Sequence, residues 1–329
     1  MDQEVSPTAL NTTRRKVIRV GLIAIACGLL AFGYYEFWLR RPIGFGPVGI
    51  AVDATPFSSI WSERDVLLLG LGDSITAGFG SSPGRSHFKL VEQGHLDDPA
   101  DVRNLTLKKV LPHLRSKNAA LSGTTSIELI EFSLPRQEPA AVETFGIVLL
   151  STGGNDVIHH YGRTPPREGA MFGATVEQAE PWIDNYRHRL TMILEKIDAL
   201  FPGGCEIFVM NIYDPTDGIG DSENAGLPAW KDGLEVLRRY NEVIAEVCNG
   251  RTNAHMIDIR GPFLGHGIHC RKFWKPFYQR HDPFYWYFDN LEDPNDRGYD
   301  AMRRLVLNEI ALKVPARLSK LPSTQTAAQ

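Results

Sequence analysis

Apolar residues along this chain follow three kinds of pattern. One long apolar run, residues 17–39, is interrupted only by Arg19 near its start and Glu36 near its end. Short apolar runs, typical of strands buried on both faces of a sheet, lie at residues 65–72, 118–121, 145–150, 206–213 and 255–259. Apolar residues at helical spacing predict helices over 182–201, 234–248 and 294–312.

Strands and helices alternate from residue 65 onward. This order predicts an α/β fold, a three-layer sandwich around a doubly wound, mostly parallel, five-stranded sheet. We expect Asp293 to cap the last helix, with Pro294 in its first turn. Ligands of such sheets bind beyond the carboxyl ends of the strands. Polar and glycine residues follow those ends at 73–74, 122–123 and 155–156, so we expect the site there.

The long apolar run is preceded by positive charge, at Arg14, Arg15, Lys16 and Arg19. A bilayer span needs about 20 apolar residues, and a basic flank predicts that the N-terminus stays in the cytoplasm. The flank also resembles a twin-arginine export signal. Since no small-residue cleavage site follows, we expect an uncleaved membrane anchor, with the folded domain in the periplasm or outside the cell.

These patterns divide the chain into five predicted parts. They are a cytoplasmic N-terminus (1–16), a transmembrane anchor (17–39), a Pro- and Gly-containing linker (40–64), one folded domain (65–318) and a disordered tail (319–329). The composition, with 43% apolar and 22% charged residues, is that of a globular protein. A formal net charge of -4 provides no basic field, so we exclude a nucleic-acid partner.

Ser74 is the first candidate for chemistry. It follows the first predicted strand, where a strand-to-helix turn would expose its hydroxyl, and Gly72 and Gly78 leave room around it. A serine at such a turn can act as a nucleophile if a base lies beside it. By itself, Asp73-Ser74 could equally be a helix cap.

Two further segments give this serine a context. Residues 72–78, 122–123 and 153–156 resemble, in order, spacing and position, the first three sequence blocks of the SGNH (GDSL-type) hydrolase family. The resemblance implies a flavodoxin-like hydrolase fold and a carboxylic ester hydrolase that needs no cofactor or metal ion. It also implies that Ser74 is the nucleophile. The oxyanion hole would be formed by the Ser74 amide, the Gly123 amide and the Asn155 side chain.

The fourth block departs from the family pattern. The family has Asp-x-x-His before the last helix, whereas this chain has Asn290 and Asp293 in those two places. A carboxylate, with a reference pKa of about 4, is a weak base for a hydroxyl at neutral pH. We therefore expect the catalytic base to come from another segment.

A glycine-rich loop after the fifth predicted strand contains candidate bases. We expect His269 to act as the base, with Asp293 or a neighbouring carboxylate orienting it; His266 and then His281 are the alternatives. Two other interpretations stay open. The histidine pair could bind a metal ion together with these carboxylates, or the histidines could simply pack among the loop's aromatic residues.

The predicted function is ester hydrolysis outside the cytoplasm, through an acyl-enzyme on Ser74. The substrate would be a small-molecule ester or an acylated glycan or lipid. One alternative is acyl transfer to a cell-envelope glycan, which shares the first half-reaction. Another is a glycan-binding module without catalysis, suggested by Asp293 in the histidine place. The retained Ser74, Gly123 and Asn155 favour an enzyme.

Overall fold

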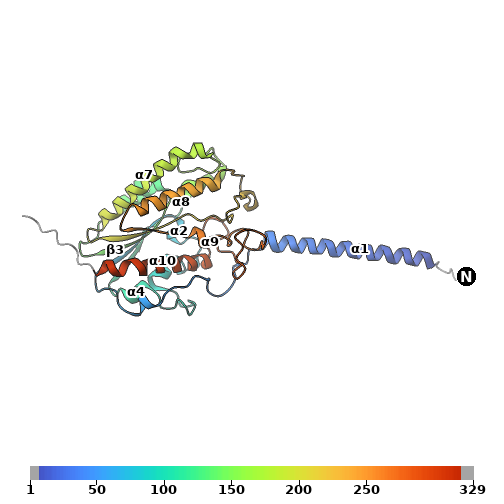
Figure 1. The fold of residues 1–329 in the computed structure, drawn as a ribbon, viewed down its shortest axis with the longest axis horizontal. Coiled ribbons are helices and arrows are strands. Elements are labelled where there is room, and N and C mark those ends of the chain that lie inside the picture. Colours follow the sequence, from blue (N-terminus) through green and yellow to red (C-terminus); the bar gives the residue numbers. More distant parts are fainter. Residues whose placement is uncertain (1–6, 320–329) are drawn as a thin grey trace, which may run out of the picture.

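The structure is a computed structural model that describes residues 7–319. A layered domain carries a single helix that projects from one end (Figure 1). The first residues of the predicted cytoplasmic segment, and all but Ser319 of the predicted tail, lie outside the described range.

The projecting helix consists of α1 (Pro7–Tyr34) and a π-helical turn, η1 (Tyr35–Leu39). Its stretch Arg14–Leu39 is long and apolar enough to cross a membrane. The apolar core of this stretch is not buried inside the protein. By length and composition, such a helix suits a membrane span, and an N-terminal signal sequence has the same features. The structure therefore confirms one apolar N-terminal helix of spanning length.

The sheet has five parallel strands in the order β2-β1-β3-β4-β5. They are β1 (Val66–Gly72), β2 (Leu114–Asn118), β3 (Phe145–Ser151), β4 (Cys205–Met210) and β5 (Ala254–Ile257). The predicted α/β fold is confirmed, and the sheet is wholly parallel. The second strand was misplaced at 118–121. As an edge strand with half-exposed polar residues, β2 shows no apolar run.

Helices cover both faces of the sheet (Figure 1). α3 (His87–Gln93), α4 (Leu107–Val110) and α10 (Asp296–Leu318) pack on one face, and α7 (Val176–Leu200) and α8 (Gly233–Asn249) pack on the other. Short helices follow the strand ends: α2 (Ser74–Ala77), α5 (Ser126–Glu128), α6 (Gly154–Ile158) and α9 (Arg260–Phe263). Strand side chains alternate between the faces: Leu149 joins one core and Leu150 the other.

The start of α10 differs from the prediction. The helix begins at Asp296, and Asn295 is its N-cap, whose side chain accepts the Arg297 and Gly298 amides. Pro294 remains extended because it forms an antiparallel bridge with Tyr287. Asp293 is therefore not a helix cap, and its carboxylate is available for other contacts.

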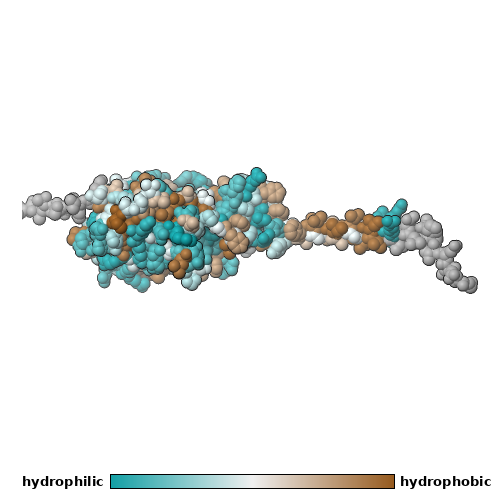
Figure 2. Space-filling view, turned by 90° about the horizontal axis from the view of Figure 1, so that it is seen from below, coloured by the Kyte–Doolittle hydropathy of each residue, from teal (hydrophilic) through white to brown (hydrophobic). Residues whose placement is uncertain are grey.

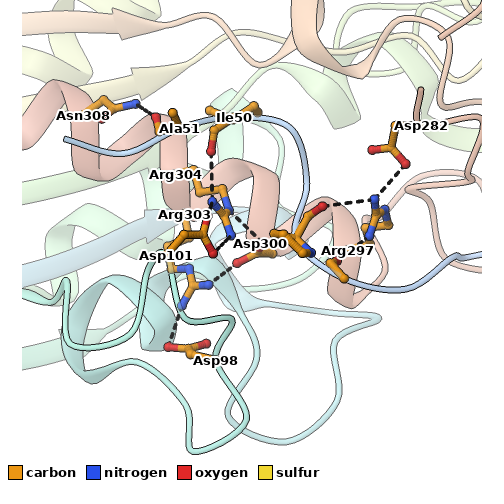
Figure 3. Close-up of polar contacts among 12 residues, drawn as sticks. Ile50, Ala51, Asp98, Asp101, Asp282, Arg297, Asp300, Arg303, Arg304 and Asn308 are labelled. Atoms are coloured by element: carbon orange, nitrogen blue, oxygen red, sulfur yellow. Dashed lines mark hydrogen bonds and ion pairs between the residues drawn. The ribbon is translucent and has the colours of Figure 1, made fainter. Parts of the chain in front are cut away.

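Residues 40–64, predicted as a linker, lie against the domain. Val48 and Phe57 are buried in its core. Figure 3 shows how α10 holds the segment: Arg304 donates to the Ile50 carbonyl at 2.9 Å, and Asn308 donates to the Ala51 carbonyl at 2.9 Å. Arg304 is itself fully buried and ion-paired with aspartates. The connection between anchor and domain is therefore fixed rather than loose.

Candidate active site

Ser74 lies where β1 turns into α2, and it is partly exposed. Asp73 caps the turn by accepting the Ile75 amide at 3.1 Å. At Gly72, φ is +113°, and a Cβ there would lie 1.8 Å from the Ser151 carbonyl oxygen. Only glycine allows β1 and β3 to approach so closely at this point. The close approach places Ser74 beside the end of β3.

A buried network holds the turn that carries Ser74. Asp73 accepts a hydrogen bond from the Ser151 hydroxyl at 2.5 Å. The same Ser151 oxygen accepts the Thr76 amide at 3.2 Å and its hydroxyl at 2.8 Å. Burial raises the pKa of Asp73 to about 6. Since its side chain points into this network, Asp73 positions α2 on β3.

The three predicted oxyanion donors follow neighbouring strands. Gly123 has φ +84° and open space around its Cα. Asn155, at the start of α6, donates its side-chain amide to the Thr124 carbonyl at 3.1 Å. Within residues 7–319, the Ser74 and Gly123 amides have no hydrogen-bond partner. Free amides at this edge suit an oxyanion hole, and the assignment of the three donors stays a prediction.

Asp156 connects the two loops that carry these donors. It is fully buried and accepts the Ser126 amide at 2.7 Å and the Ser126 hydroxyl at 2.5 Å. Arg189 of α7 donates to the Ser126 hydroxyl at 2.8 Å and lies 3.5 Å from Asp156. Burial raises the pKa of Asp156, against the hydrogen bonds from Ser126 and the charge of Arg189, which lower it. Asp156 therefore holds the loop after Gly123 against α6.

Asp293 lies beside the Ser74 hydroxyl. The Ser74 side chain lies close enough to the Asp293 carboxyl group to lower its pKa. Oδ1 of Asp293 has no hydrogen-bond partner among the described residues. Oδ2 accepts the Asn290 side-chain amide at 2.7 Å. Asn290 also accepts the Asp293 backbone amide at 3.1 Å, so the carboxylate is held on a short turn.

Burial raises the pKa of Asp293, and the contacts with Ser74 and Asn290 lower it by less. The neighbouring Glu292 lines the cavity at Ser74, and its pKa is raised to about 7, first by burial and then by the charge of Asp293. A carboxylate with a raised pKa is a better proton acceptor than an exposed one. The raised pKa makes the Asp293 carboxylate a stronger base than the reference value of an aspartate suggests.

The three predicted histidines lie elsewhere. His269 is buried, and its Nε2 contacts Asp221 at 2.8 Å. The ring of His266 stacks on Trp286 with 3.6 Å between centroids, and burial lowers its pKa to about 4. His281 is exposed. None of the three lines the cavity at Ser74, whereas the Asp293 carboxyl group lies close to the Ser74 side chain.

The histidine loop is held away from Ser74 by a buried carboxylate that sequence analysis did not consider. Asp217 accepts the backbone amides of Gly265, Gly267 and His269, each at 2.8 Å. These bonds hold the histidine loop against residues 214–227. Among the described residues, no group of histidine, cysteine and carboxylate side chains is arranged to hold a metal ion. The position of His266 on Trp286 agrees with the packing interpretation.

A cavity of about 160 Å³ opens at Ser74. Asp73, Ser74, Asn155 and Glu292 lie at its polar end. Most of its wall is apolar and comes from α6, the segments after β3 and β4, and the start of α8; it includes Val157, Ile158, Phe172, Ile212, Leu227, Trp230, Leu234 and Leu237. The cavity therefore combines a few polar groups with a mostly apolar wall, as small-molecule sites commonly do.

Asn290 is the functional candidate that sequence analysis undervalued. It was identified as a departure from the family's Asp-x-x-His block, not as a residue with a role of its own. The signal was the spacing, because Asn290 and Asp293 keep the three-residue separation of the family's pair.

Comparison with known proteins gives one family match. The family model described as GDSL-like lipase/acylhydrolase matches residues 71–301, more than half of the chain. No curated protein sequence matches the chain.

Solved structures show distant likenesses. They include an extracellular lipase from Streptomyces rimosus (15% identity, 75% of this chain and 99% of that one, TM-score 0.47). A phospholipase A1 from Streptomyces albidoflavus has 18% identity, 75% and 99% coverage and a TM-score of 0.44. An acetylxylan esterase from Geobacillus stearothermophilus has 19% identity, 76% and 96% coverage and a TM-score of 0.43.

Proposed function

The chain belongs to the GDSL-like lipase/acylhydrolase family, and from this premise we propose that it hydrolyses carboxylic esters outside the cytoplasm with Ser74 as nucleophile and Asp293 as base. The family makes the chain a carboxylic ester hydrolase. The observation that supports Asp293 as the base is its buried carboxyl group close to the Ser74 side chain, with one oxygen free of hydrogen bonds among the described residues.

In the proposed reaction, Asp293 accepts the Ser74 proton while Oγ attacks the ester carbonyl carbon. The carbonyl oxygen takes up negative charge, which the Ser74 and Gly123 amides and the Asn155 side chain would stabilise. Asp293 then returns its proton to the leaving alkoxide, and an acyl-enzyme remains. Water enters with the same carboxylate as base and releases the acid, so the enzyme returns to its starting state.

In the pair Asn290 and Asp293, the donor and the acceptor of the orienting hydrogen bond have exchanged positions relative to the family's pair. In an Asp-x-x-His pair, the imidazole donates to the carboxylate that orients it. Here Asn290 donates its amide to Asp293 Oδ2. One oxygen of the proposed base is thus held by the amide, and the other has no hydrogen-bond partner among the described residues. Both partners are exchanged together, so the orienting hydrogen bond is retained.

The location follows from the anchor. Arg14, Arg15, Lys16 and Arg19 precede the apolar stretch of α1, and a basic flank of this kind stays on the cytoplasmic side. The domain that follows Leu39 would then lie on the other side of the membrane. The apolar wall of the cavity favours esters with an aliphatic acyl group among the predicted substrates.

Active-site labelling tests the nucleophile and the base together. A fluorescent phosphonate ester should label Ser74, and Ser74→Ala should abolish both labelling and turnover of p-nitrophenyl esters. Asp293→Asn should lower kcat by about 10²- to 10⁴-fold, as expected for loss of a general base. Asp289→Asn is the matched control, because Asp289 is an exposed carboxylate of the same turn. It should leave turnover unchanged.

Two outcomes would contradict the proposal. Ester hydrolysis that survives Ser74→Ala rules out Ser74 as nucleophile. A folded wild-type protein that is neither labelled nor active, but binds acylated glycans, is a binding module without catalysis.

A further inference from the structure

Aromatic side chains from two distant segments meet where the anchor helix reaches the domain. Phe37 and Trp38 of η1 contact Phe273 and Trp274, with ring centroids 5.0–5.8 Å apart. We call these four residues the aromatic collar. Although they pack on one another, Phe273 is 63% exposed, Trp274 47% and Trp38 44%. Such exposure of large aromatic rings is unusual on a surface that faces only water.

The collar lies at the level where the bilayer surface should be. From Arg19 to Leu39 the helix spans about 20 residues, or about 30 Å at 1.5 Å per residue. This length matches the hydrocarbon thickness of a bilayer, about 30 Å. If Arg19 lies at the cytoplasmic interface, Trp38 lies at the opposite one, and its contact partner Trp274 lies beside it. Tryptophan is enriched at that depth.

Basic residues surround the collar. Arg40, Arg41 and Lys275 lie beside it in sequence, and the Lys272 ammonium lies 4.9 Å from the Trp38 ring centroid. Aromatic rings with neighbouring cations are the side chains that bind the headgroup region of a membrane. Figure 2 shows the apolar surface of α1 and, next to it, apolar patches among polar ones at the end of the domain.

The domain cannot turn freely about the anchor. Glu36 forms ion pairs with Arg40, at 2.9 Å, and with Arg271. Arg271 lies in the loop of residues 271–278, which carries Phe273 and Trp274 and which we call the collar loop. Beyond the collar, Arg297 donates to the Gly46 carbonyl at 2.7 Å. The contacts of α10 with residues 50–51 then continue the attachment (Figure 3). One orientation of the domain relative to the membrane is therefore built into the fold.

In that orientation the active-site edge of the sheet faces the membrane. α10 begins next to Asp293, on the side from which α1 projects, and ends at the far side (Figure 1). Residues 214–227 lie between the cavity at Ser74 and the collar loop, and they contact both. Pro215 and Gly220 line the cavity at Ser74, while the Pro215 carbonyl accepts the Ile268 amide and Gly218 packs against Phe277 of the collar loop.

We propose that the aromatic collar is a second membrane contact, which docks the domain on the bilayer surface and turns the Ser74 cavity toward it. The substrates would then be amphiphilic esters that enter from the lipid phase. The substrate class rests on the proposed esterase function, whereas the docking does not. The apolar cavity wall would receive the acyl chain as it leaves the bilayer.

The first test measures the turnover of two substrates by the full-length protein reconstituted in liposomes. Phe273→Glu/Trp274→Glu should lower turnover of a long-chain ester embedded in the bilayer at least about tenfold, while turnover of a soluble p-nitrophenyl ester stays unchanged. The soluble substrate reports that the variant is folded. Val142→Glu/Leu312→Glu is the matched control: both residues are similarly exposed, at 65% and 67%, and Leu312 lies near the far end of α10. It should leave both turnovers unchanged.

The second test needs no activity. The tryptophan emission that is lost in Trp274→Phe should be quenched when the bilayer contains lipids brominated on the upper acyl chain, and unbrominated lipids should not quench it. Phenylalanine keeps the collar apolar, so the two proteins should dock alike.

The tests separate the two proposals. Quenching of Trp274 without any Ser74-dependent hydrolysis supports docking and overturns the esterase function. Normal hydrolysis with an unquenched Trp274 overturns docking and leaves the function intact. Quenching together with equal loss of both turnovers in Phe273→Glu/Trp274→Glu overturns the assignment of bilayer substrates.

Discussion

At the scale of single residues, Asn290 and Asp293 show how a hydrogen-bonded pair can be changed without losing its geometry. The amide of Asn290 donates, and the carboxylate of Asp293 accepts and faces Ser74. A change of Asn290 alone to aspartate would place two carboxylates in contact. Such a contact would misorient the base. The pair is therefore best understood as one unit.

The pH dependence of turnover should report this carboxylate. Asp293 acts as a base only when ionised, so activity should be present above its raised pKa and be lost as the pH falls through that value. Asn290→Asp/Asp293→His should move the acid limb to about 6.5, the imidazole value. Both proteins should also carry Glu292→Gln, because the pKa of Glu292 is about 7 and its ionisation would overlap.

The single variant Asp293→His is the control for this pH experiment. Its imidazole lacks the orienting carboxylate, so it should be less active than the double variant. An acid limb that stays at the same pH in the double variant would show that the base does not lie at position 293.

At the scale of elements, the site depends on short connections between strand ends. β1 pairs with β2 and β3, so the segments after these three strands meet at one edge. Asp156 then joins α6 to the Ser126 turn, and Arg189 adds α7 to the same cluster. The predicted oxyanion donors are held through these contacts and not by the strands alone.

Removal of the Asp156 carboxylate, which joins α6 to the Ser126 turn, should lower both the stability of the protein and its turnover. Asp156→Ala leaves the Ser126 amide buried without an acceptor and removes a partner of Arg189, and we expect a loss of about 3 kcal/mol in the free energy of unfolding. The melting temperature of the detergent-solubilised protein should fall by roughly 6–12 °C.

The control for the Asp156 link is Glu168→Ala. It removes the other, partly exposed carboxylate paired with Arg189, and it should have a much smaller effect. Equal effects of the two variants would assign the stability to Arg189 pairing in general.

At the scale of the whole molecule, the projecting helix and the fixed connection decide where the domain works. Protease added to intact spheroplasts should degrade the domain, because the basic flank of α1 keeps only the N-terminal segment inside. Detection of the domain on an immunoblot provides the measurement, and a cytoplasmic marker that survives is the control. Full protection of the domain would exclude this topology.

The sequence alone determined the parts of this protein that depend on local patterns. Apolar runs located four of the five strands, helical spacing located the long helices, and the turn at Ser74 was recognisable from its neighbours. An apolar run records burial directly, because each residue in it loses contact with water. The edge strand β2 was misplaced because it is only half buried.

Only the tertiary structure decided which side chain meets Ser74. The loop with His269 and the turn with Asp293 both follow β5, and nothing in their spacing shows which one reaches the serine. That choice depends on bonds between separate segments, namely those from the histidine loop to Asp217 and from the Trp286 amide to the His266 carbonyl. The packed course of residues 40–64 likewise depends on partners in α10, about 250 residues away. Contacts between distant segments leave no periodic signal in the sequence, and they determine which side chains lie near Ser74.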